Sequence, residues 1–122
     1  MRISTFDKMN NLSIITVNFN QSGVTEELLR SISSTNRYPN IEIIVVDNGS
    51  KINDVPELKI RYPYVKFIRS EINLGFAGGN NLGVTEATGN YLFFVNNDTE
   101  FTPGLVETLV NVLDANPKVG MI

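Results

Sequence analysis

Apolar and polar residues follow one another in blocks along this chain, and the blocks predict alternating strands and helices. Short, almost wholly apolar runs predict buried strands, and longer segments with apolar residues three or four positions apart predict helices. The predicted strands are Leu12–Val17, Ile41–Val46, Val65–Arg69 and Tyr91–Val95, with Val119–Ile122 as the opening of a further strand. The predicted helices are Ser22–Ser34, a helix that begins near Asp54 and ends before Pro63, Gly75–Ala87, and a helix between Thr102 and Asn116.

Local signals mark where these helices begin and end. Asp54 is predicted to cap a helix that has Pro56 in its first turn, and Glu57 completes a capping box. Gly89 is predicted to follow the last turn of the Gly75–Ala87 helix as a left-handed glycine. The pair Thr102–Pro103 predicts an N-cap followed by a first-position proline.

The order of elements predicts the fold class. Continuous apolar strands need cover on both faces, and connections between parallel strands are right-handed. The chain is therefore predicted to form an α/β fold, a doubly wound and mostly parallel sheet with helices on both faces. Residues 1–11 are predicted to be a polar extension, and residues 12–122 one domain.

Composition excludes several classes of site. The chain has 122 residues, a net charge of −3, no cysteine and no histidine, which excludes disulfides, thiolate nucleophiles, Ser-His-Asp triads and histidine-based metal sites. A net negative charge argues against nucleic-acid binding. Four basic residues are interpreted as a solvated face: Lys59, Arg61, Lys66 and Arg69. No run has the length to cross a bilayer, so the chain is predicted to be cytoplasmic, with peripheral contact at the inner membrane face left open.

Polar side chains follow three of the predicted strands. Asn18–Gln21 follows the first strand, Asp47–Ser50 the second, and Asn96–Asp98 the fourth. Ligands of open α/β sheets bind beyond the carboxyl ends of the strands. Each segment alone is also a good turn sequence, but three of them at one edge favour a binding site.

The residue types suit a nucleoside diphosphate. Asp47 is a candidate acceptor for the ring N–H of uracil or thymine, or for a ribose hydroxyl. Phe19 is either a stacking partner for the base or a core aromatic. Asp98, with Asn96 and Asn97 beside it, supplies the hard oxygen donors that Mg²⁺ or Mn²⁺ prefers, and such an ion would bridge the two phosphates.

The glycine-rich segment Asn73–Gly83 precedes and opens the third predicted helix. Glycines at a helix N-terminus allow an anion to approach the backbone. The spacing fits neither the dinucleotide-binding fingerprint nor the P-loop. Close packing of the helix on the sheet is the alternative explanation, and both can hold together.

Taken together, these motifs resemble the family 2 glycosyltransferases, inverting enzymes with the GT-A fold. The resemblance runs from Leu12 to Ile122. The segments Gly75–Gly83 and Asn97–Thr99 are most similar in sequence to the rhamnosyltransferase-like branch. It implies that Asp47 contacts the base and that Asp98 is the last acid of the Asp-x-Asp metal motif. The residues expected at the nucleotide are Val17, Asn18, Phe19, Asn20, Asp47, Asn48, Gly75, Gly79, Asn80 and Asn97, and those at the metal are Asp98 and Asn96.

The sequence also departs from the family pattern. Asn96 stands where the first metal-binding Asp is usual, and Asn80 stands where many members have Arg. The catalytic base of the family lies in the acceptor-binding half, so it is expected beyond Ile122, and Glu100 and Glu107 are interpreted as a loop residue and a helix-surface charge. The predicted function is transfer of a sugar from a UDP- or dTDP-linked donor to a glycan or lipid-linked acceptor hydroxyl in bacterial surface polysaccharide synthesis. The alternative is a nucleotide-sugar-binding fragment or module without turnover, and self-association is expected through the truncated end.

Overall fold

A computed structural model of the chain describes residues 10–122, and its core is a four-stranded parallel sheet. Residues 1–9 of the predicted N-terminal extension lie outside the described residues. The strands are β1 (Leu12–Asn18), β2 (Ile41–Asn48), β3 (Val65–Ser70) and β4 (Tyr91–Phe94), in the order β3-β2-β1-β4. The helices are α2 (Ser22–Thr35), α3 (Val55–Arg61), α4 (Gly75–Glu86) and α5 (Leu105–Ala115). The predicted fold class is confirmed.

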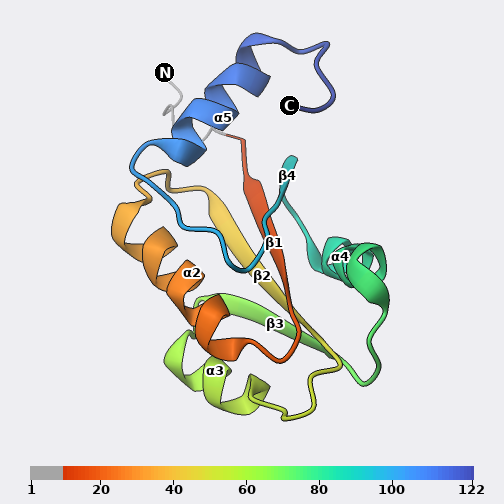
Figure 1. Cartoon of the computed structure of the whole chain (residues 1–122). Coiled ribbons are helices and arrows are strands. Elements are labelled where there is room, and N and C mark those ends of the chain that lie inside the picture. The colour runs from red at the N-terminus through yellow and green to blue at the C-terminus, as the bar shows by residue number, and fades with distance from the viewer. Residues whose placement is uncertain (1–9) are drawn as a thin grey trace, which may run out of the picture.

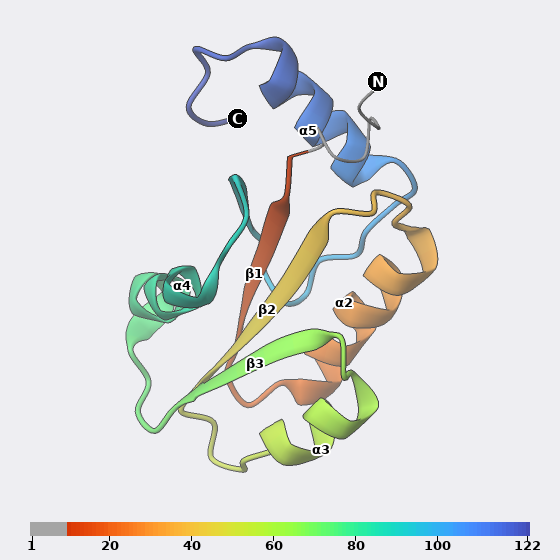
Figure 2. The same ribbon diagram turned by 180° about the vertical axis from the view of Figure 1, so that it is seen from behind.

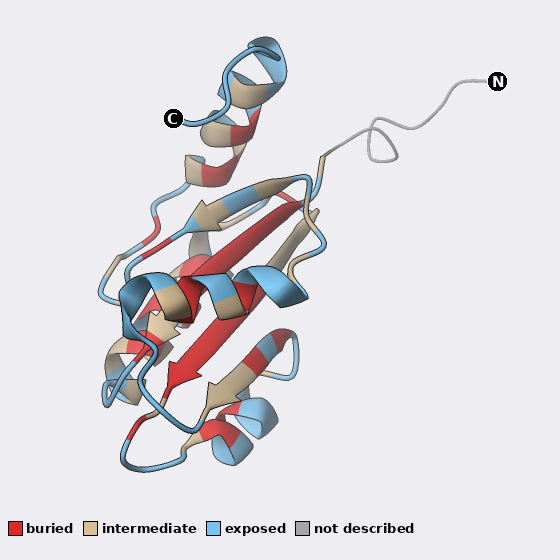
Figure 3. Ribbon diagram, turned by 90° about the vertical axis from the view of Figure 1, so that its right-hand side faces the viewer, coloured by how far each residue is buried: buried red, intermediate tan, exposed pale blue. Residues whose placement is uncertain are grey.

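Helices cover both faces of the sheet (Figures 1 and 2). Helices α2, α3 and α5 pack on one face, where Ile14 of β1 and Val45 of β2 belong to the larger hydrophobic cluster. Helix α4 packs on the other face, over a smaller cluster that contains Ile15, Ile44 and Val46. Side chains of a strand alternate between faces, so one branched apolar run supplies both cores. Figure 3 shows the buried residues concentrated in the central strands.

Glycines let α4 approach the sheet closely. A Cβ atom at Gly83 would lie 2.6 Å from Ile15 Cγ2, and one at Gly79 would lie 3.1 Å from Val17 Cγ1 and from Asn48 Nδ2. The packing explanation of this glycine-rich helix is therefore confirmed. Since α4 contacts β1 and β2, the face of β4 on the same side lies open.

The prediction of a buried fourth strand is wrong. Leu92 and Phe94 are 43% and 48% exposed, because β4 is an edge strand and no helix among residues 10–122 covers that side of it. The prediction of a strand over Val119–Ile122 is also wrong. These residues form an irregular segment whose side chains help to line an apolar hollow of about 520 Å³ against β4 and α5.

The predicted cap at the start of α3 is wrong in detail. The Asp54 carboxylate makes no cap bond to α3 but accepts a hydrogen bond from Ser22 Oγ at 2.8 Å. The Val55 N–H donates instead to Asn53 Oδ1 at 3.1 Å, so the capping box with Glu57 does not form. The Asp54 carboxylate therefore makes a tertiary contact with α2 instead of capping α3.

The glycine predictions need a similar correction. Gly89 does not have a positive φ, and α4 ends at Glu86 with Ala87 as its C-cap residue. A Cβ at Gly89 would meet Ser13 Oγ at 2.6 Å, so close packing explains this glycine. Helix α5 begins at Leu105 after Gly104, whose φ is +82°, rather than at Thr102–Pro103. No helix of the described residues has the length and apolar character to cross a membrane.

Candidate functional site

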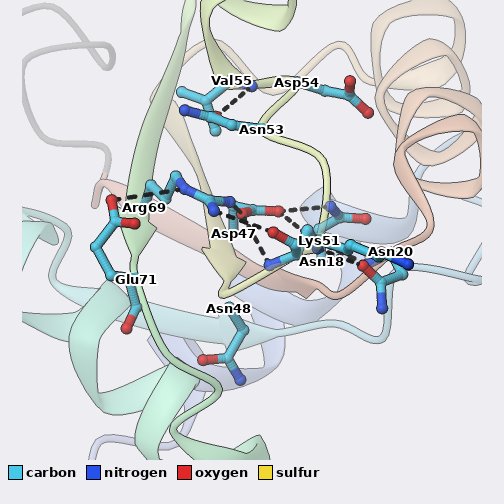
Figure 4. A network of polar contacts seen from close by, with 12 residues as sticks. Asn18, Asn20, Asp47, Asn48, Lys51, Asn53, Asp54, Val55, Arg69 and Glu71 are labelled. Carbon is cyan, nitrogen blue, oxygen red and sulfur yellow. Dashed lines mark hydrogen bonds and ion pairs between the residues drawn. The ribbon is translucent and has the colours of Figure 1, made fainter.

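The carboxyl ends of the parallel strands gather the predicted polar side chains at one edge of the sheet (Figure 4). Asn18 of β1 is in register with Asp47 of β2, which is in turn in register with Arg69 of β3. Three segments that are far apart in the sequence therefore present their side chains side by side. The exits of the first and second strands lie side by side as expected, and Arg69 of the third strand, for which no exit was predicted, joins them.

Asp47 is the centre of this network and is almost fully buried, with 3% of its surface exposed. Its Oδ1 accepts hydrogen bonds from Asn18 Nδ2 at 2.9 Å and from Ser50 Oγ at 2.6 Å. Its Oδ2 accepts from the Ser50 N–H at 3.3 Å and forms an ion pair with Arg69. A carboxylate offers about four acceptor positions, and protein donors occupy all of them. A ligand N–H reaches Asp47 only when one of these donors moves away.

Arg69 belongs to this site and not to a solvated face, so the interpretation from the sequence is wrong for this residue. Its side chain is 17% exposed, and its Nη2 also donates to the Ser50 carbonyl at 3.0 Å. Glu71 Oε1 lies 3.7 Å from Arg69 Nε. The available signal was its place at the carboxyl end of a predicted strand. A guanidinium with further N–H donors now lies at the candidate nucleotide site, which otherwise lacks the expected charge at Asn80.

The loops after β1 and β2 are fastened to one another. Asn20 has a φ of +56°, a left-handed conformation that Asn tolerates better than most residues. Its N–H donates to Ser50 Oγ at 2.8 Å, and its Oδ1 accepts from the Lys51 N–H at 2.8 Å. Beside these loops is a hollow of about 280 Å³, lined by Asn20, Ser22, Ser50, Lys51, Ile52 and Asp54.

Phe19 is available for a ligand. It is 44% exposed, so the alternative of a core aromatic is wrong. Val17, two residues earlier on β1, packs against α4 with the smaller core cluster. The exposed ring is placed on the same loop as Asn20, next to the Asp47 network, where a base can lie against its face.

Asn48 holds the entrance to α4 rather than facing solvent. It is 3% exposed, its Oδ1 accepts from the Leu74 N–H at 2.9 Å, and its Nδ2 donates to the Gly75 carbonyl at 3.0 Å and to Asn73 Oδ1 at 3.1 Å. Gly75 itself has a φ of +77°. The first turn of α4 is thereby fixed next to the candidate site, with the Leu74 and Gly75 N–H groups bonded to Asn48 and Asn73.

Asn80 faces inward on α4. Its side chain is 8% exposed, and Nδ2 donates to the Phe76 carbonyl at 3.2 Å. Gly79, one residue earlier, is buried against Asn48 and Val17. The structure thus gives both residues a packing role, while their predicted contact with a nucleotide stays a prediction.

The segment after β4 forms a turn, with the Thr99 N–H donating to the Asn96 carbonyl at 3.0 Å. Asn97 reaches back to α2, where its Nδ2 donates to Thr25 Oγ1 at 3.2 Å and to Gln21 Oε1 at 3.4 Å. Asp98 is exposed and helps to line a hollow of about 820 Å³ beside α2, which Asp47 does not line. The hydrogen-bonded network around Asp47 thus reaches this turn through Asn97, whereas Asp98 lines a separate hollow and shares no enclosed cleft with Asp47.

Thr25 and Asn18 join the two ends of this edge. Thr25 Oγ1 donates to Asn18 Oδ1 at 2.9 Å, and Asn18 Nδ2 donates to Asp47. Both residues are buried. Thr25, Ser50 and Arg69 are absent from the set of site residues expected from the sequence. The strand end was a signal for Arg69, but the local sequence does not show which distant partner any of the three side chains will bind.

The donor set for a divalent ion is small. Within residues 10–122 no group of three or more acidic, histidine or cysteine side chains is arranged to hold a metal. Asn96 and Asp98 are both exposed and offer an amide oxygen and a carboxylate. Mg²⁺ commonly keeps several waters and takes one or two carboxylates plus phosphate oxygens from its substrate. The residues fit an ion of that kind when a diphosphate completes its coordination.

Comparison with known proteins gives a consistent result. The model of the family described as glycosyl transferase family 2 matches residues 13–122. A protein of Haemophilus influenzae described as an uncharacterized glycosyltransferase is 34% identical over 111 residues, which cover 91% of this chain and 37% of the relative. A poly-beta-1,6-N-acetyl-D-glucosamine synthase of Staphylococcus epidermidis is 27% identical over 122 residues, covering 98% of this chain and 29% of the synthase.

Solved structures share the fold. The crystal structure of S. aureus TarS 1-349 matches with a TM-score of 0.76 and 23% identity, covering 88% of this chain and 33% of that chain. The same fragment in complex with UDP gives the same values. The chain thus spans a little over a third of the length of the first curated relative and a third of the TarS fragment.

Proposed function

This chain belongs to glycosyl transferase family 2, and we propose that its residues form the nucleotide-sugar-binding part of an enzyme that transfers a sugar to an acceptor hydroxyl. The observation that carries the proposal is the gathering of the β1, β2 and β3 exits around Asp47, with the turn after β4 joined to them through Asn97. Family membership supports sugar-transfer chemistry at this edge, and the geometry supports the choice of residues proposed below.

We assign the nucleoside to the β1 and β2 side of the edge. Phe19 would lie against the base, and the loop residues Asn20 and Ser50 would shape the pocket beside it. Asp47 would accept a base N–H or a ribose hydroxyl after one of its present donors moves. The UDP bound to TarS, a neighbour with the same fold, supports a uridine nucleotide, and dTDP is the alternative.

We assign the diphosphate to the β4 and α4 side. The N-terminus of α4 would add the electrostatic stabilisation that helix N-termini give to negative charge, while its Leu74 and Gly75 N–H groups stay bonded to Asn48 and Asn73. Asp98 and Asn96 would hold a Mg²⁺ or Mn²⁺ ion. When bound, such an ion stabilises the negative charge of a departing diphosphate as a Lewis acid.

The transfer step is proposed for the whole protein. The catalytic base that deprotonates the acceptor hydroxyl is expected beyond Ile122, as the family resemblance implies. The name of the S. epidermidis relative, a polysaccharide synthase, supports a glycan acceptor and a role in surface polysaccharide synthesis. Inversion at the sugar, a rhamnosyltransferase-like donor and a cytoplasmic location belong to the same proposal.

Binding without turnover is the second candidate, because the chain spans only 29–37% of the two relatives described above. Hydrolysis or transfer of a UDP-sugar by this chain, compared with a version as long as its relatives, distinguishes the two. Self-association through the open edge of β4 is a further proposal, since that strand carries exposed apolar side chains.

Calorimetric titration tests the binding proposal. UDP, dTDP and GDP are titrated with EDTA, with Mg²⁺ and with Mn²⁺, and tighter binding of UDP or dTDP with metal is the expected result. At 100 times its Kd, a nucleotide should raise the free energy of unfolding by about 2.7 kcal/mol. Absence of binding for all three nucleotides under every condition would refute the proposal.

Two variants locate the metal effect. Asp98→Ala should remove the metal-dependent gain in affinity without unfolding the chain, because its side chain is exposed. Glu100→Ala, two residues away on the same loop and also exposed, is the matched control and should keep that gain. Equal metal dependence in Asp98→Ala and the parent would exclude Asp98 as a ligand.

A further inference from the structure

A directional chain of hydrogen bonds runs through the buried base of the site. Asn97 Nδ2 donates to Thr25 Oγ1 at 3.2 Å, Thr25 Oγ1 donates to Asn18 Oδ1 at 2.9 Å, and Asn18 Nδ2 donates to Asp47 Oδ1 at 2.9 Å. Each group donates in the same direction, toward the Asp47 carboxylate. Hydrogen bonds aligned in this way polarise one another, and a charged acceptor at the end strengthens them.

Among the four residues joined by these hydrogen bonds, Thr25 is the only one that lies on a helix. It is fully buried in α2, and its single O–H serves Asn18 while its oxygen accepts from Asn97. A hydroxyl is needed for this, because it is the small group that donates and accepts at once. The residue therefore joins the exit of β1 to the turn that follows β4.

The turn after β4 has few other attachments. The Val95 N–H continues the ladder to the Ile15 carbonyl at 2.9 Å, and the Phe101 N–H donates to Ser31 Oγ at 2.9 Å. Between these two residues, Asn97 is the residue of the turn whose side chain forms hydrogen bonds with the rest of the described chain. The position of Asp98, the next residue, therefore depends on the partners of Asn97.

We propose that Thr25 is a positioning residue that couples the Asn96–Asp98 turn to the nucleoside side of the site. This inference rests on the proposed function, because it assigns the metal and diphosphate to that turn. Thr25 does not contact the ligand. It fixes the distance and orientation between the groups that hold the diphosphate and the groups that hold the nucleoside.

The coupling predicts a specific loss. Without the Thr25 hydroxyl, Asn97 loses its buried acceptor and the turn is held less firmly, so Asp98 meets the metal–diphosphate less often in the productive position. Nucleoside binding depends on Phe19 and the β1 and β2 loops. Asn18 loses the donor to its Oδ1 but keeps its bond to Asp47, and the loops keep their contacts through Ser50. The gain in affinity that metal gives should fall more than the affinity measured without metal.

The test compares Thr25→Val, which keeps the shape of the side chain, with Thr25→Ser, which keeps the hydroxyl. The quantity measured is the ratio of the UDP Kd in EDTA to the UDP Kd in saturating Mn²⁺. Thr25→Val should lower this ratio roughly tenfold, the effect of about 1.4 kcal/mol, whereas Thr25→Ser should retain it. Thr108→Val is the matched control, because the Thr108 hydroxyl binds only the carbonyl of Gly104 one turn earlier in α5.

A lower melting temperature alone does not support the proposal, since loss of any buried hydrogen bond produces it. A ratio within twofold of the parent in folded Thr25→Val overturns the proposal. Hydrogen exchange without ligand gives a second measurement. Amides of residues 96–100 should exchange faster in Thr25→Val but not in Thr108→Val, and unchanged exchange also overturns the coupling. If the parent binds no nucleotide but exchange responds as expected, the proposed function fails while the structural coupling holds.

Discussion

Glu42 ties together three segments at the edge of the sheet opposite the candidate site. Its carboxylate accepts hydrogen bonds from Ser13 Oγ, Lys66 Nζ, and the backbone N–H and hydroxyl of Thr88. Thr88 lies between α4 and β4, so this one side chain fastens that connection to β1, β2 and β3. Replacement by Gln should therefore destabilise the domain far more than an exposed carboxylate would.

The pKa of Glu42 gives the magnitude. Burial opposes ionisation and raises the pKa, but the hydrogen bonds from Lys66, Ser13 and Thr88 together outweigh it and lower the pKa from 4.5 to about 2. At 1.36 kcal/mol per pKa unit, this shift corresponds to about 3 kcal/mol of stability from the ionised form. Because the folded-state pKa is depressed, that stability is fully present above pH 4.5 and is lost as the pH falls toward 2.

Urea unfolding of the parent and Glu42→Gln between pH 2 and pH 7 measures this contribution. At pH 7 the variant should be less stable by about 2–3 kcal/mol, since Gln keeps the shape but loses the charge-assisted bonds. The difference should shrink as the pH falls from 4.5 to 2. Glu27→Gln, at an exposed position on α2, should change stability by less than about 0.5 kcal/mol. Parallel stability–pH curves for the parent and Glu42→Gln would refute the reasoning.

Further predictions concern the close packing of glycines and the open edge of β4. Gly83→Ala should destabilise the domain by about 1–3 kcal/mol in urea unfolding, because the new Cβ would meet Ile15 at 2.6 Å. Gly23→Ala in α2 is the control. Its Cβ would meet nothing within 4 Å, so this variant should be more stable than the parent by about 0.5–1 kcal/mol. Phe94→Lys on the open face of β4 should reduce self-association in sedimentation experiments at high concentration, and a parent that stays monomeric would contradict the proposed edge contact.

Element types were predictable from the sequence where local preference and tertiary context agree. The runs Leu12–Val17 and Ile41–Val46 are branched and apolar, and both became central strands with neighbours on each side. The run Tyr91–Val95 has the same apolar character but lies at the edge of the sheet. Periodicity alone cannot tell how many neighbours a strand will have, so the burial of β4 was predicted wrongly.

Helix ends were less predictable for a related reason. Asp54 has the right type and position for a cap, yet its carboxylate binds Ser22 from another helix. Glu107 has the composition of a surface residue, yet its oxygens are buried. For Asp54 a partner that is distant in the sequence decides which interaction forms, and for Glu107 the tertiary packing around α5 decides its burial. Local spacing carries no information about either.

The candidate site shows the same division. The strand exits, and so the location of Asn18, Asp47 and Asn97, followed from the sequence, because parallel strands end at one edge. The partners did not follow, and Arg69 was assigned to a solvated face although it pairs with Asp47. The polar residue types predicted a binding edge, but not which of them hold the edge together.

The exposed fractions separate two groups of residues at this edge. Asn18, Asp47 and Asn48 are at most 3% exposed and bind other protein groups, so their first effect is to fix the loops in place. Phe19 and Asp98 are exposed and therefore free to contact a ligand. Substitutions in the first group should lower stability and nucleotide affinity together, whereas substitutions in the second group should lower affinity with little change in stability. A site built in this way keeps its shape before the ligand arrives, because the buried polar side chains satisfy one another rather than wait for a partner.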